Sequence, residues 1–241
     1  MLSGRAIHRF ASTPSTMIEA ATLASGGAPH GTLVIADTQT AGQGRHGHAW
    51  HSEPGTGLYL SLILRPALGM EALLALTLAA GLAARSAISD TTGFTCDLRW
   101  PNDLMHGDRK LGGILLQSQQ GAVIAGFGIN TGHATFPQEL AHTAVSLRMI
   151  LGFAPSRDEL AASIADRMDE SCAVMEVHGA GPVIAGFARA SSYAEGKRVI
   201  VDERATGTTA GLDSRGFLRL RHDDGQVTTV LAGGVRPLTL S

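Results

Sequence analysis

Short β-type segments separated by glycine and aspartate fill the chain from about Glu195 to its end, and they limit the fold more than any other feature. Gly or Asp returns about every eight residues, as between the strands of a small barrel or sandwich. The residues before them alternate between helical and strand patterns. We therefore predict an α+β domain at residues 1–190 followed by a small all-β domain at residues 191–241.

Runs of apolar and β-branched residues predict strands in the first domain at 31–39, 57–66, 94–100, 110–119 and 122–129. The second of these alternates strictly, with leucines on one face and other side chains on the opposite face. A Gln-Gly pair separates the last two strands. These two strands are therefore expected to pair as a hairpin.

Two capping boxes predict helix starts, one at Thr16 with Glu19 and one at Ser156 with Glu159. Between them, an alanine- and leucine-rich sequence predicts a helix at about 71–88. Its apolar stretch, 72–84, is shorter than the ~20 residues that a membrane span needs. We interpret it as a buried core helix and expect no membrane association.

Basic and acidic residues nearly balance, 19 against 21, which gives a formal net charge of −2. A protein that coats nucleic acid usually has a basic excess, so this function class is disfavoured. Cys96 and Cys172 lie outside any Cys-x-x-Cys pattern, which excludes a disulfide framework and a cysteine zinc site. With no secretory signal pattern and with free thiols, a cytoplasmic protein is expected.

The segment from Gln39 to Trp50 is a glycine-rich loop that follows a predicted strand. Gly42, Gly44 and Gly47 leave room for backbone N–H groups to approach an anion, while Arg45 can bind phosphate or carboxylate oxygens. Trp50 offers a flat apolar face to a ring. The spacing alone is equally compatible with a surface loop that carries a solvated arginine.

Three histidines, His46, His48 and His51, lie in or beside the same loop. A zinc site is one interpretation of them. No glutamate-bearing zinc-protease pattern surrounds them, and a glycine loop does not fix them on one face. We expect solvated side chains rather than metal ligands.

A second motif, Arg99-Trp100-Pro101-Asn102-Asp103, combines a strand end with polar residues. Proline cannot extend the strand ladder, so Asn102 and Asp103 are expected where the strand ends, a frequent place for binding residues. Asp103 could hold Mg²⁺ directly or through water. An ordinary Asn-Asp turn is the alternative.

Lys110 opens a predicted strand that carries Gly112 and Gly113, and the next strand carries Gly126 and Gly128. Glycines leave backbone bare, so a ligand can lie directly against it. Tight sheet packing explains each pair separately. Together with the arginine loop, the two pairs favour a floor for a small ring system. Asn130 follows at the strand end as a partner for a base or ribose.

The ordered set of motifs resembles that of the biotin–protein ligases, also called biotin–[biotin carboxyl carrier protein or acetyl-CoA-carboxylase] ligases, in their short form. The resemblance covers nearly the whole chain. Its segments are Ser15-Thr16, Gln39–Trp50, Arg99–Asp103, Arg109–Leu115, Gly126–Asn130, Phe136-Pro137, Ser146-Leu147 and the C-terminal β region.

This resemblance implies a mixed-sheet biotin/lipoate ligase-like catalytic domain with a small C-terminal SH3-like β-barrel. It implies that ATP activates biotin as biotinyl-5′-AMP, and that biotin then passes to one lysine of a biotin carboxyl carrier protein. ATP and biotin would be substrates, Mg²⁺ would assist, and no tightly bound prosthetic group is expected.

The family's roles carry over to matching positions. Biotin would be bound by Ser15, Thr16, Gln39, Gln43, Gly44, Arg45, Lys110, Gly113, Gly126 and Gly128. ATP and the adenylate would be bound by Arg45, Trp50, Arg99, Asn102, Lys110, Asn130 and Ser146. Arg45, Lys110 and Asp103 would be catalytic, with Asp103 the magnesium candidate.

Three positions depart from the family pattern. Gln43 stands where an arginine is common, Arg99 replaces the usual lysine, and Met17 replaces the usual asparagine after Ser-Thr. Arginine keeps the charge of lysine but not its shape. The effect of these changes on binding is open at this level.

The resemblance also bears on partners. Members that repress transcription carry a helix-turn-helix domain ahead of the catalytic one, and here the catalytic pattern begins near Met1, so we expect no sequence-specific DNA binding. The sequence allows a homodimer. Other functions stay open: a lipoate or octanoate ligase or transferase, a non-catalytic biotin-binding protein, or a plain nucleotide-binding domain.

Overall fold

A computed structural model describes residues 4–238. The first three residues of the first predicted domain and the last three residues of the second lie outside the described residues. The first part contains β1 (Ile7–Phe10), α1 (Thr16–Ser25), β2 (Leu33–Ala36), η1 (Arg45–Gly47), β3 (Gly57–Leu64), η2 (Met70–Ala72), α2 (Leu73–Thr92), β4 (Asp97–Arg99), β5 (Asp103–His106), β6 (Arg109–Gln119), β7 (Ala122–Asn130), α3 (Leu147–Leu151), α4 (Arg157–His178) and α5 (Gly181–Ala190). The second part contains β8 (Glu195–Val201), β9 (Ala205–Leu212), β10 (Leu218–Arg221), β11 (Val227–Val230) and β12 (Val235–Pro237).

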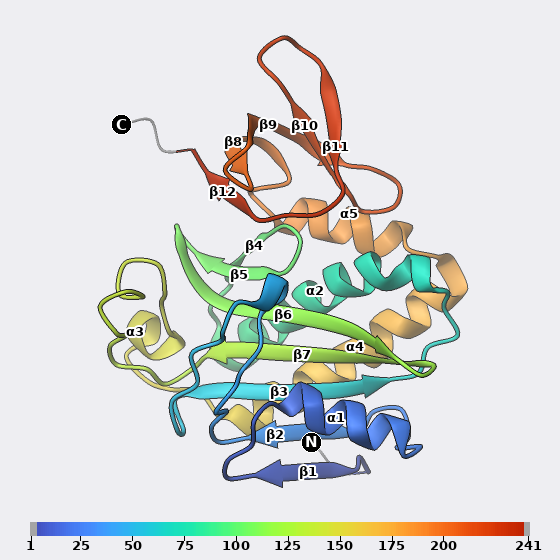
Figure 1. The fold of residues 1–241 in the computed structure, drawn as a ribbon, viewed down its shortest axis with the longest axis vertical. Helices are drawn as coiled ribbons and strands as arrows, with labels where there is room; N and C mark the ends of the chain where they lie inside the picture. Colours follow the sequence, from blue (N-terminus) through green and yellow to red (C-terminus); the bar gives the residue numbers. More distant parts are fainter. Residues whose placement is uncertain (1–3, 239–241) are drawn as a thin grey trace.

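The strands form two sheets, as Figure 1 shows. The first has seven strands in the order β1-β2-β3-β7-β6-β5-β4, and the second has five in the order β11-β10-β9-β8-β12. β1 and β2 run parallel, while β2 and β3 run antiparallel, so the predicted mixed sheet is confirmed. The second sheet is antiparallel. Its closure into an SH3-like barrel stays a prediction.

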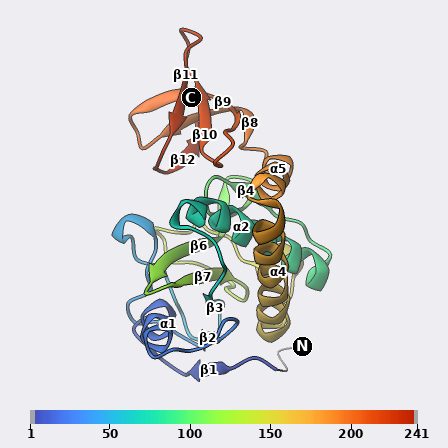
Figure 2. The ribbon, with the colours of Figure 1, turned by 90° about the vertical axis from the view of Figure 1, so that its right-hand side faces the viewer.

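Helices cover the seven-stranded sheet on both faces, but unequally (Figure 2). α2 and α4 lie on one face, where the leucines of β3 join the main core. α1 lies on the other face, where Met17 packs near Ile63 and Ile124. β3 alternates as predicted, yet all of its residues are buried. Its leucines face the main core, whereas its other face lies partly under α1 and, at Tyr59, beside the loop residue Glu53. Beyond α1, the second face carries the glycine-bearing parts of β6 and β7.

Helix α2 is longer than the sequence pattern predicted. It runs to Thr92 and ends at Gly93, whose φ of 74° suits a residue without a side chain. By length and composition the helical run Met70–Thr92 could cross a membrane, but 56% of its most apolar window is buried in the protein. Contacts with α4, α5 and β6 account for that burial, as expected for a core helix.

The helix starts were predicted with mixed accuracy. Ser156 caps α4 and accepts a hydrogen bond from the Glu159 N–H, as predicted. At α1 the cap is Ser15 rather than Thr16, and Ser15 accepts from the Met17 N–H. The predicted capping box at Thr16 is therefore wrong by one residue. This shift frees the Thr16 side chain to face the sheet.

The region around Trp100 also differs from prediction. The strand expected at 94–100 is limited to β4, and the chain then reverses so that Asp103 opens β5 opposite Arg99. The pattern gave no signal for β1, β5, α3 or α5. The hairpin of β6 and β7 is confirmed, with Gln120 and Gly121 both at positive φ.

Trp100 joins the two sheets. Its ring is buried in the main core, and its Nε1–H donates to the Gly216 carbonyl at 2.9 Å. Gly216 has a φ of 89°, a backbone conformation that favours glycine, and a side chain there would lie 2.9 Å from Leu78. Residues of both sheets belong to one continuous core. The second sheet is therefore held in place beside the polar residues that follow Trp100.

Trp100→Phe tests this junction. The change leaves the Gly216 carbonyl without its donor, so we expect the free energy of unfolding to fall by about 1–3 kcal/mol. Urea denaturation measures it. Val177→Ala is the control, because that side chain is 74% exposed and should change stability by no more than about 0.5 kcal/mol. Equal stability of Trp100→Phe and wild type would contradict the role of this bond.

Candidate functional site

The glycine loop folds back on itself as an irregular hairpin. Gln43 bridges to Ala49, and the Gly44 N–H donates to the His48 carbonyl at 2.7 Å. A side chain at Gly42 would lie 2.8 Å from the Trp50 carbonyl, so glycine permits the two arms to approach. The hairpin places Arg45 at its tip and Trp50 at its return to the sheet.

Arg45 points from this tip toward two separate elements. Its Nη1 donates to Asn102 Oδ1 at 3.1 Å and to the Gly233 carbonyl, in the loop between β11 and β12, at 3.4 Å. Burial lowers the pKa of Arg45, while the negative charges of Asp103 and Asp202 oppose that change. A guanidinium stays charged at neutral pH even so. The loop therefore carries a fixed, half-buried positive charge.

Asp103 lies between two cations. Its Oδ1 is 2.5 Å from Lys110 Nζ, and its Oδ2 accepts from Arg99 at 2.7 Å. Burial alone would raise the pKa of Asp103, but the charges of Lys110 and Arg99 hold it below its ordinary value. Asp103 is therefore ionised at neutral pH and fixes the position of both cations.

This arrangement bears on the magnesium prediction, which stays a prediction. Both oxygens of Asp103 are engaged by cations, and its side chain is only 14% exposed. A magnesium ion at these oxygens would share them with Lys110 and Arg99, since it binds through carboxylate oxygens or through water. Arg99 uses its Nε and Nη2 for Asp103, and its nucleotide role stays a prediction. The geometry supports a positioning role of Asp103 toward both cations.

Asn102 connects the two charged groups. Its Oδ1 accepts from Arg45, and its Nδ2 donates to the Ile114 carbonyl at 2.8 Å. The next residue, Asp103, pairs with Lys110. Arg45 and Lys110, which are far apart in the sequence, thus belong to one site through adjacent residues of the same turn.

The predicted glycine floor exists, and two side chains cover it. Gly113 of β6 lies opposite Gly128 of β7. A Cβ at Gly128 would lie 2.5 Å from the Trp50 ring, and one at Gly113 would lie 3.2 Å from it. Lys110 Nζ lies 5.5 Å from the Trp50 ring centroid. The floor therefore accepts a flat ring directly against backbone.

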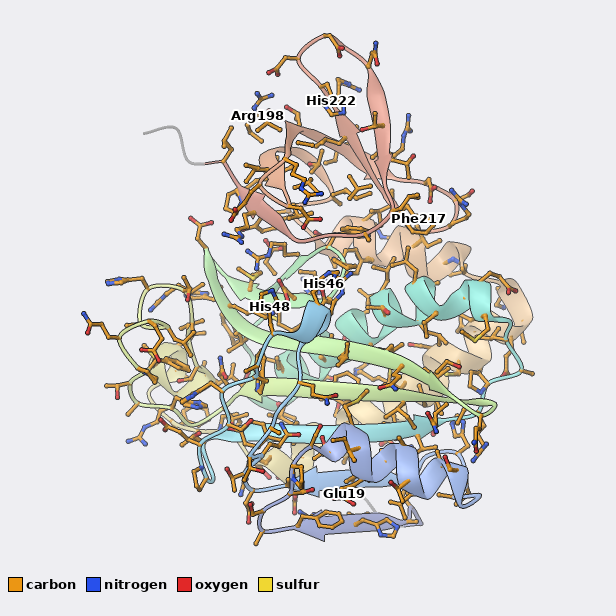
Figure 3. All side chains as sticks on the ribbon, viewed as in Figure 1. Glu19, His46, His48, Arg198, Phe217 and His222 are labelled. Atoms are coloured by element: carbon orange, nitrogen blue, oxygen red, sulfur yellow. The ribbon has the colours of Figure 1, made fainter. Side chains whose placement is uncertain are left out.

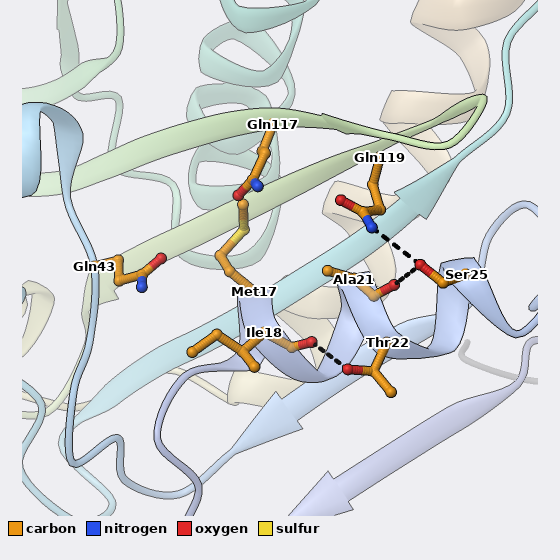
Figure 4. A pocket seen from close by; sticks show the side chains of 8 residues that line it. All are labelled: Met17, Ile18, Ala21, Thr22, Ser25, Gln43, Gln117 and Gln119. Atoms are coloured by element: carbon orange, nitrogen blue, oxygen red, sulfur yellow. Dashed lines mark hydrogen bonds between the residues drawn. The ribbon is translucent and has the colours of Figure 1, made fainter.

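Met17 covers the remaining floor glycine. A Cβ at Gly126 would be 2.5 Å from the Met17 sulfur. Met17 also lines a neighbouring groove of about 450 Å³, shown in Figure 4. The groove lies between α1 and β6, and its polar lining comes from Thr22, Ser25, Gln43, Gln117 and Gln119. A ligand on the floor can extend into this groove if the flexible methionine moves.

A hydrogen-bond chain joins two of the predicted biotin-binding residues, Thr16 and Gln39. Gln39 Oε1 accepts from the Thr16 N–H at 2.8 Å and from its hydroxyl at 3.2 Å. Ser61 donates to the Thr16 hydroxyl at 2.8 Å. Sequence reasoning missed Ser61, although a serine inside an otherwise apolar, buried strand was the available signal. Ser15, Thr16 and Ser61 are all buried.

Two residues predicted to contact the nucleotide also make hydrogen bonds within the protein. Asn130 Nδ2 donates to the Val145 carbonyl at 3.1 Å, and the residue is buried. The Ser146 hydroxyl donates to the His133 carbonyl at 2.6 Å and accepts from the Met149 N–H. Ser146 is fully buried and caps α3, so the structure gives it a structural role.

The positions of the loop histidines agree in part with the prediction that all three are solvated. His46 and His48 are exposed near the loop tip, on the side of the second sheet (Figure 3). They share a small surface hollow with Asp202 and Arg204. His51 lies apart from them and contacts Glu53. The geometry thus separates His51 from the other two, which the sequence alone did not do.

The part of the chain that holds this site matches a known protein family. The family model described as Biotin/lipoate A/B protein ligase family matches residues 9–133, more than half of the chain. The chain belongs to the biotin/lipoate A/B protein ligase family. The resemblance drawn from the motifs is therefore confirmed, and the glycine loop, Asp103, Lys110 and the glycine floor all lie within the matched residues.

Individual relatives and a solved structure are similar to this chain over most of its length. A Bacillus subtilis protein named bifunctional ligase/repressor BirA is 35% identical over 223 residues, which cover 88% of this chain and 68% of the relative. A Mycobacterium tuberculosis biotin–[acetyl-CoA-carboxylase] ligase is 32% identical, over 88% of this chain and 80% of the relative. The structure of an Aquifex aeolicus biotin protein ligase with biotin and ATP superposes with a TM-score of 0.87 at 26% identity, covering 97% of this chain and 99% of that one.

Asp103→Asn tests the ion-pair centre of this ligase-family site. Removing the carboxylate leaves Lys110 and Arg99 without their shared partner, so we expect a loss of about 3 kcal/mol in the free energy of unfolding at pH 7. The folded pKa of Asp103 is lowered, so its contribution is complete above the unfolded value near 3.9 and disappears as the pH falls through the lower folded value. Urea denaturation from pH 7 downward measures the difference from wild type.

The control is Asp158→Asn, whose carboxylate pairs with Arg9 at the surface and is 60% exposed. Its effect should stay within about 0.5 kcal/mol at every pH. A difference between Asp103→Asn and wild type that stayed constant below pH 4 would rule out the ion pair as its cause.

Proposed function

We propose that this chain is an ATP-dependent biotin–protein ligase. It would activate biotin as biotinyl-5′-AMP and then transfer biotin to a specific lysine of a biotin carboxyl carrier protein. One observation carries the proposal. Arg45 bonds to Asn102 and Lys110 pairs with the next residue, Asp103, so both cations lie in one site beside the glycine floor of β6 and β7. Relatives named as biotin ligases, over most of the chain, support the choice of substrate.

The charges suit the first step. A carboxylate must approach the α-phosphate of ATP, and these two anions repel each other unless cations lie between them. Lys110 is 34% exposed, so its ammonium can reach a ligand while Asp103 fixes its position. Arg45 presents a planar donor set to phosphate oxygens. Together they stabilise the negative charge that develops as the acyl-phosphate bond forms and pyrophosphate leaves.

The loop suits the second requirement, which is protection of the adenylate from water. Trp50 lies against the floor, and Arg45 contacts Gly233 in the loop between β11 and β12. A loop held at both points can close over a reactive acyl-adenylate and exclude water until the acceptor lysine arrives. Gln43 lines the groove next to the floor, so its amide can serve the ligand through hydrogen bonds rather than charge.

The remaining parts of the proposal concern cofactor, partners and location. Magnesium would enter bound to the triphosphate of ATP, since Asp103 is engaged by cations. The acceptor is a carrier-protein lysine, as the ligase name of the relatives implies. A cytoplasmic location, the absence of DNA binding, a homodimer and the division into domains at 1–190 and 191–241 stay proposals.

The decisive experiment incubates the chain with biotin, Mg-ATP and a biotin carboxyl carrier domain, and follows the carrier by intact mass. We expect addition of one biotinyl group. Lys110→Ala should slow biotin-dependent pyrophosphate exchange by about 10²–10³, the usual effect of losing one well-placed group at developing charge. Arg109→Ala is the matched control at the neighbouring position and should retain exchange. An unlabelled carrier with wild-type protein would reject the proposal.

Ligand choice is tested by thermal shift with ATP present. Biotin should raise the melting temperature, because a ligand that binds only the folded state stabilises it by mass action. Lipoate at the same concentration should leave it unchanged, since its dithiolane ring offers no ureido group to Ser15, Thr16 and Gln39. A larger shift with lipoate than with biotin would favour the lipoate ligases of the same family.

A further inference from the structure

His133 is a buried imidazole with one nitrogen that has no partner. Its residue is 1% exposed, and its Nδ1 makes no hydrogen bond. Its Nε2 lies 2.8 Å from the Thr56 hydroxyl. Phe136 stacks on the ring with centroids 4.6 Å apart, which shields that side from water. A buried ring nitrogen without a hydrogen-bond partner is costly and needs an explanation.

The hydrogen bonds of Thr56 favour the His133 tautomer with its hydrogen on Nε2. The Thr56 hydroxyl donates its one hydrogen to the Glu53 carbonyl at 3.1 Å. With the hydrogen of His133 on Nε2, both contacts are satisfied at once, because Thr56 then accepts from His133 while it donates to Glu53. His133 Nδ1 then holds a free lone pair. A hydrogen bond to the distal nitrogen that leaves the other lone pair free is the usual arrangement of a metal-binding histidine.

Two further ligand groups lie beside this imidazole. One ligand atom from each of His51, Glu53 and His133 lies within 4.8 Å of the others. The rings of His51 and His133 are 5.8 Å apart between centroids, and His51 Nε2 is 3.1 Å from the Glu53 carboxylate. Ligand atoms around a zinc ion are about 3.4 Å apart, given metal–ligand bonds of about 2.1 Å. Side-chain adjustment of about 1 Å would complete the site.

We propose that His51, Glu53 and His133 form a binding site for a divalent transition metal, with Zn²⁺ as its typical ion. Two imidazoles and a carboxylate prefer zinc, cobalt or nickel to magnesium. Three protein ligands leave a coordination position open for water or a ligand atom. The cysteines do not compete, because both are buried and burial raises the pKa of each thiol to about 12.

The site joins two segments that border the candidate active site. His51 and Glu53 follow Trp50 on the glycine loop, whereas His133 follows the end of β7. A bound ion would tie the returning arm of the loop to the strand that carries the floor glycines. Its occupancy therefore controls how freely that arm of the loop moves, which is a separate property from the proposed ligase reaction.

The test uses the full chain without a purification tag, treated with chelator and titrated with ZnCl₂ by calorimetry. We expect saturable binding of one Zn²⁺ per chain and no comparable binding of Mg²⁺. Glu53→Gln and His51→Ala should each weaken binding by at least about tenfold, since even loss of an outer contact to a metal ligand costs 10–100-fold. These positions are partly exposed, with side chains 46% and 32% accessible, so both variants should fold.

His48→Ala and His142→Ala are the matched controls, because both histidines are exposed and lie on the same two segments. They should bind Zn²⁺ as tightly as wild type. As a second measurement, Co²⁺ should produce visible d–d absorption in wild type that Glu53→Gln abolishes. Absence of stoichiometric binding, or equal affinity in Glu53→Gln, His51→Ala and the controls, would overturn the proposal.

Discussion

The carboxylate of Asp103 is the interaction on which the rest of the candidate site depends. It lies between Lys110 and Arg99 and keeps both cations in place in a largely buried turn. Without it, two positive charges would lie together in a medium of low polarity, which is unfavourable. With it, the site keeps a net positive character suited to anionic substrates, while Asn102 adds Arg45 from a distant loop.

The sheet provides the second constraint. α2 and α4 cover one face along its length, whereas α1 covers only part of the other. Over the remaining part, glycines on neighbouring strands leave the backbone bare, and Trp50 and Met17 lie directly on it. The same feature that would weaken a strand, the lack of side chains, creates a flat surface for a ring.

The second sheet contributes to the site through contacts with the first part of the chain. The Trp100 indole bonds to Gly216, and two residues later Asn102 binds Arg45. Arg45 also reaches the Gly233 carbonyl. The second sheet therefore supports both the turn and the loop of the candidate site. This continuity explains why the main core extends through both sheets.

The sequence by itself determined the mixed α and β composition, the β6–β7 hairpin, the floor glycines and the family, because local periodicity and ordered motifs record them. Only tertiary structure decided the rest. Thr16 faces Gln39 because the helix cap is Ser15. Asp103 pairs with two cations because the chain reverses after Trp100, and Ser61 and His133 gain partners across distant segments. Such contacts depend on which elements pack together, which no local pattern encodes.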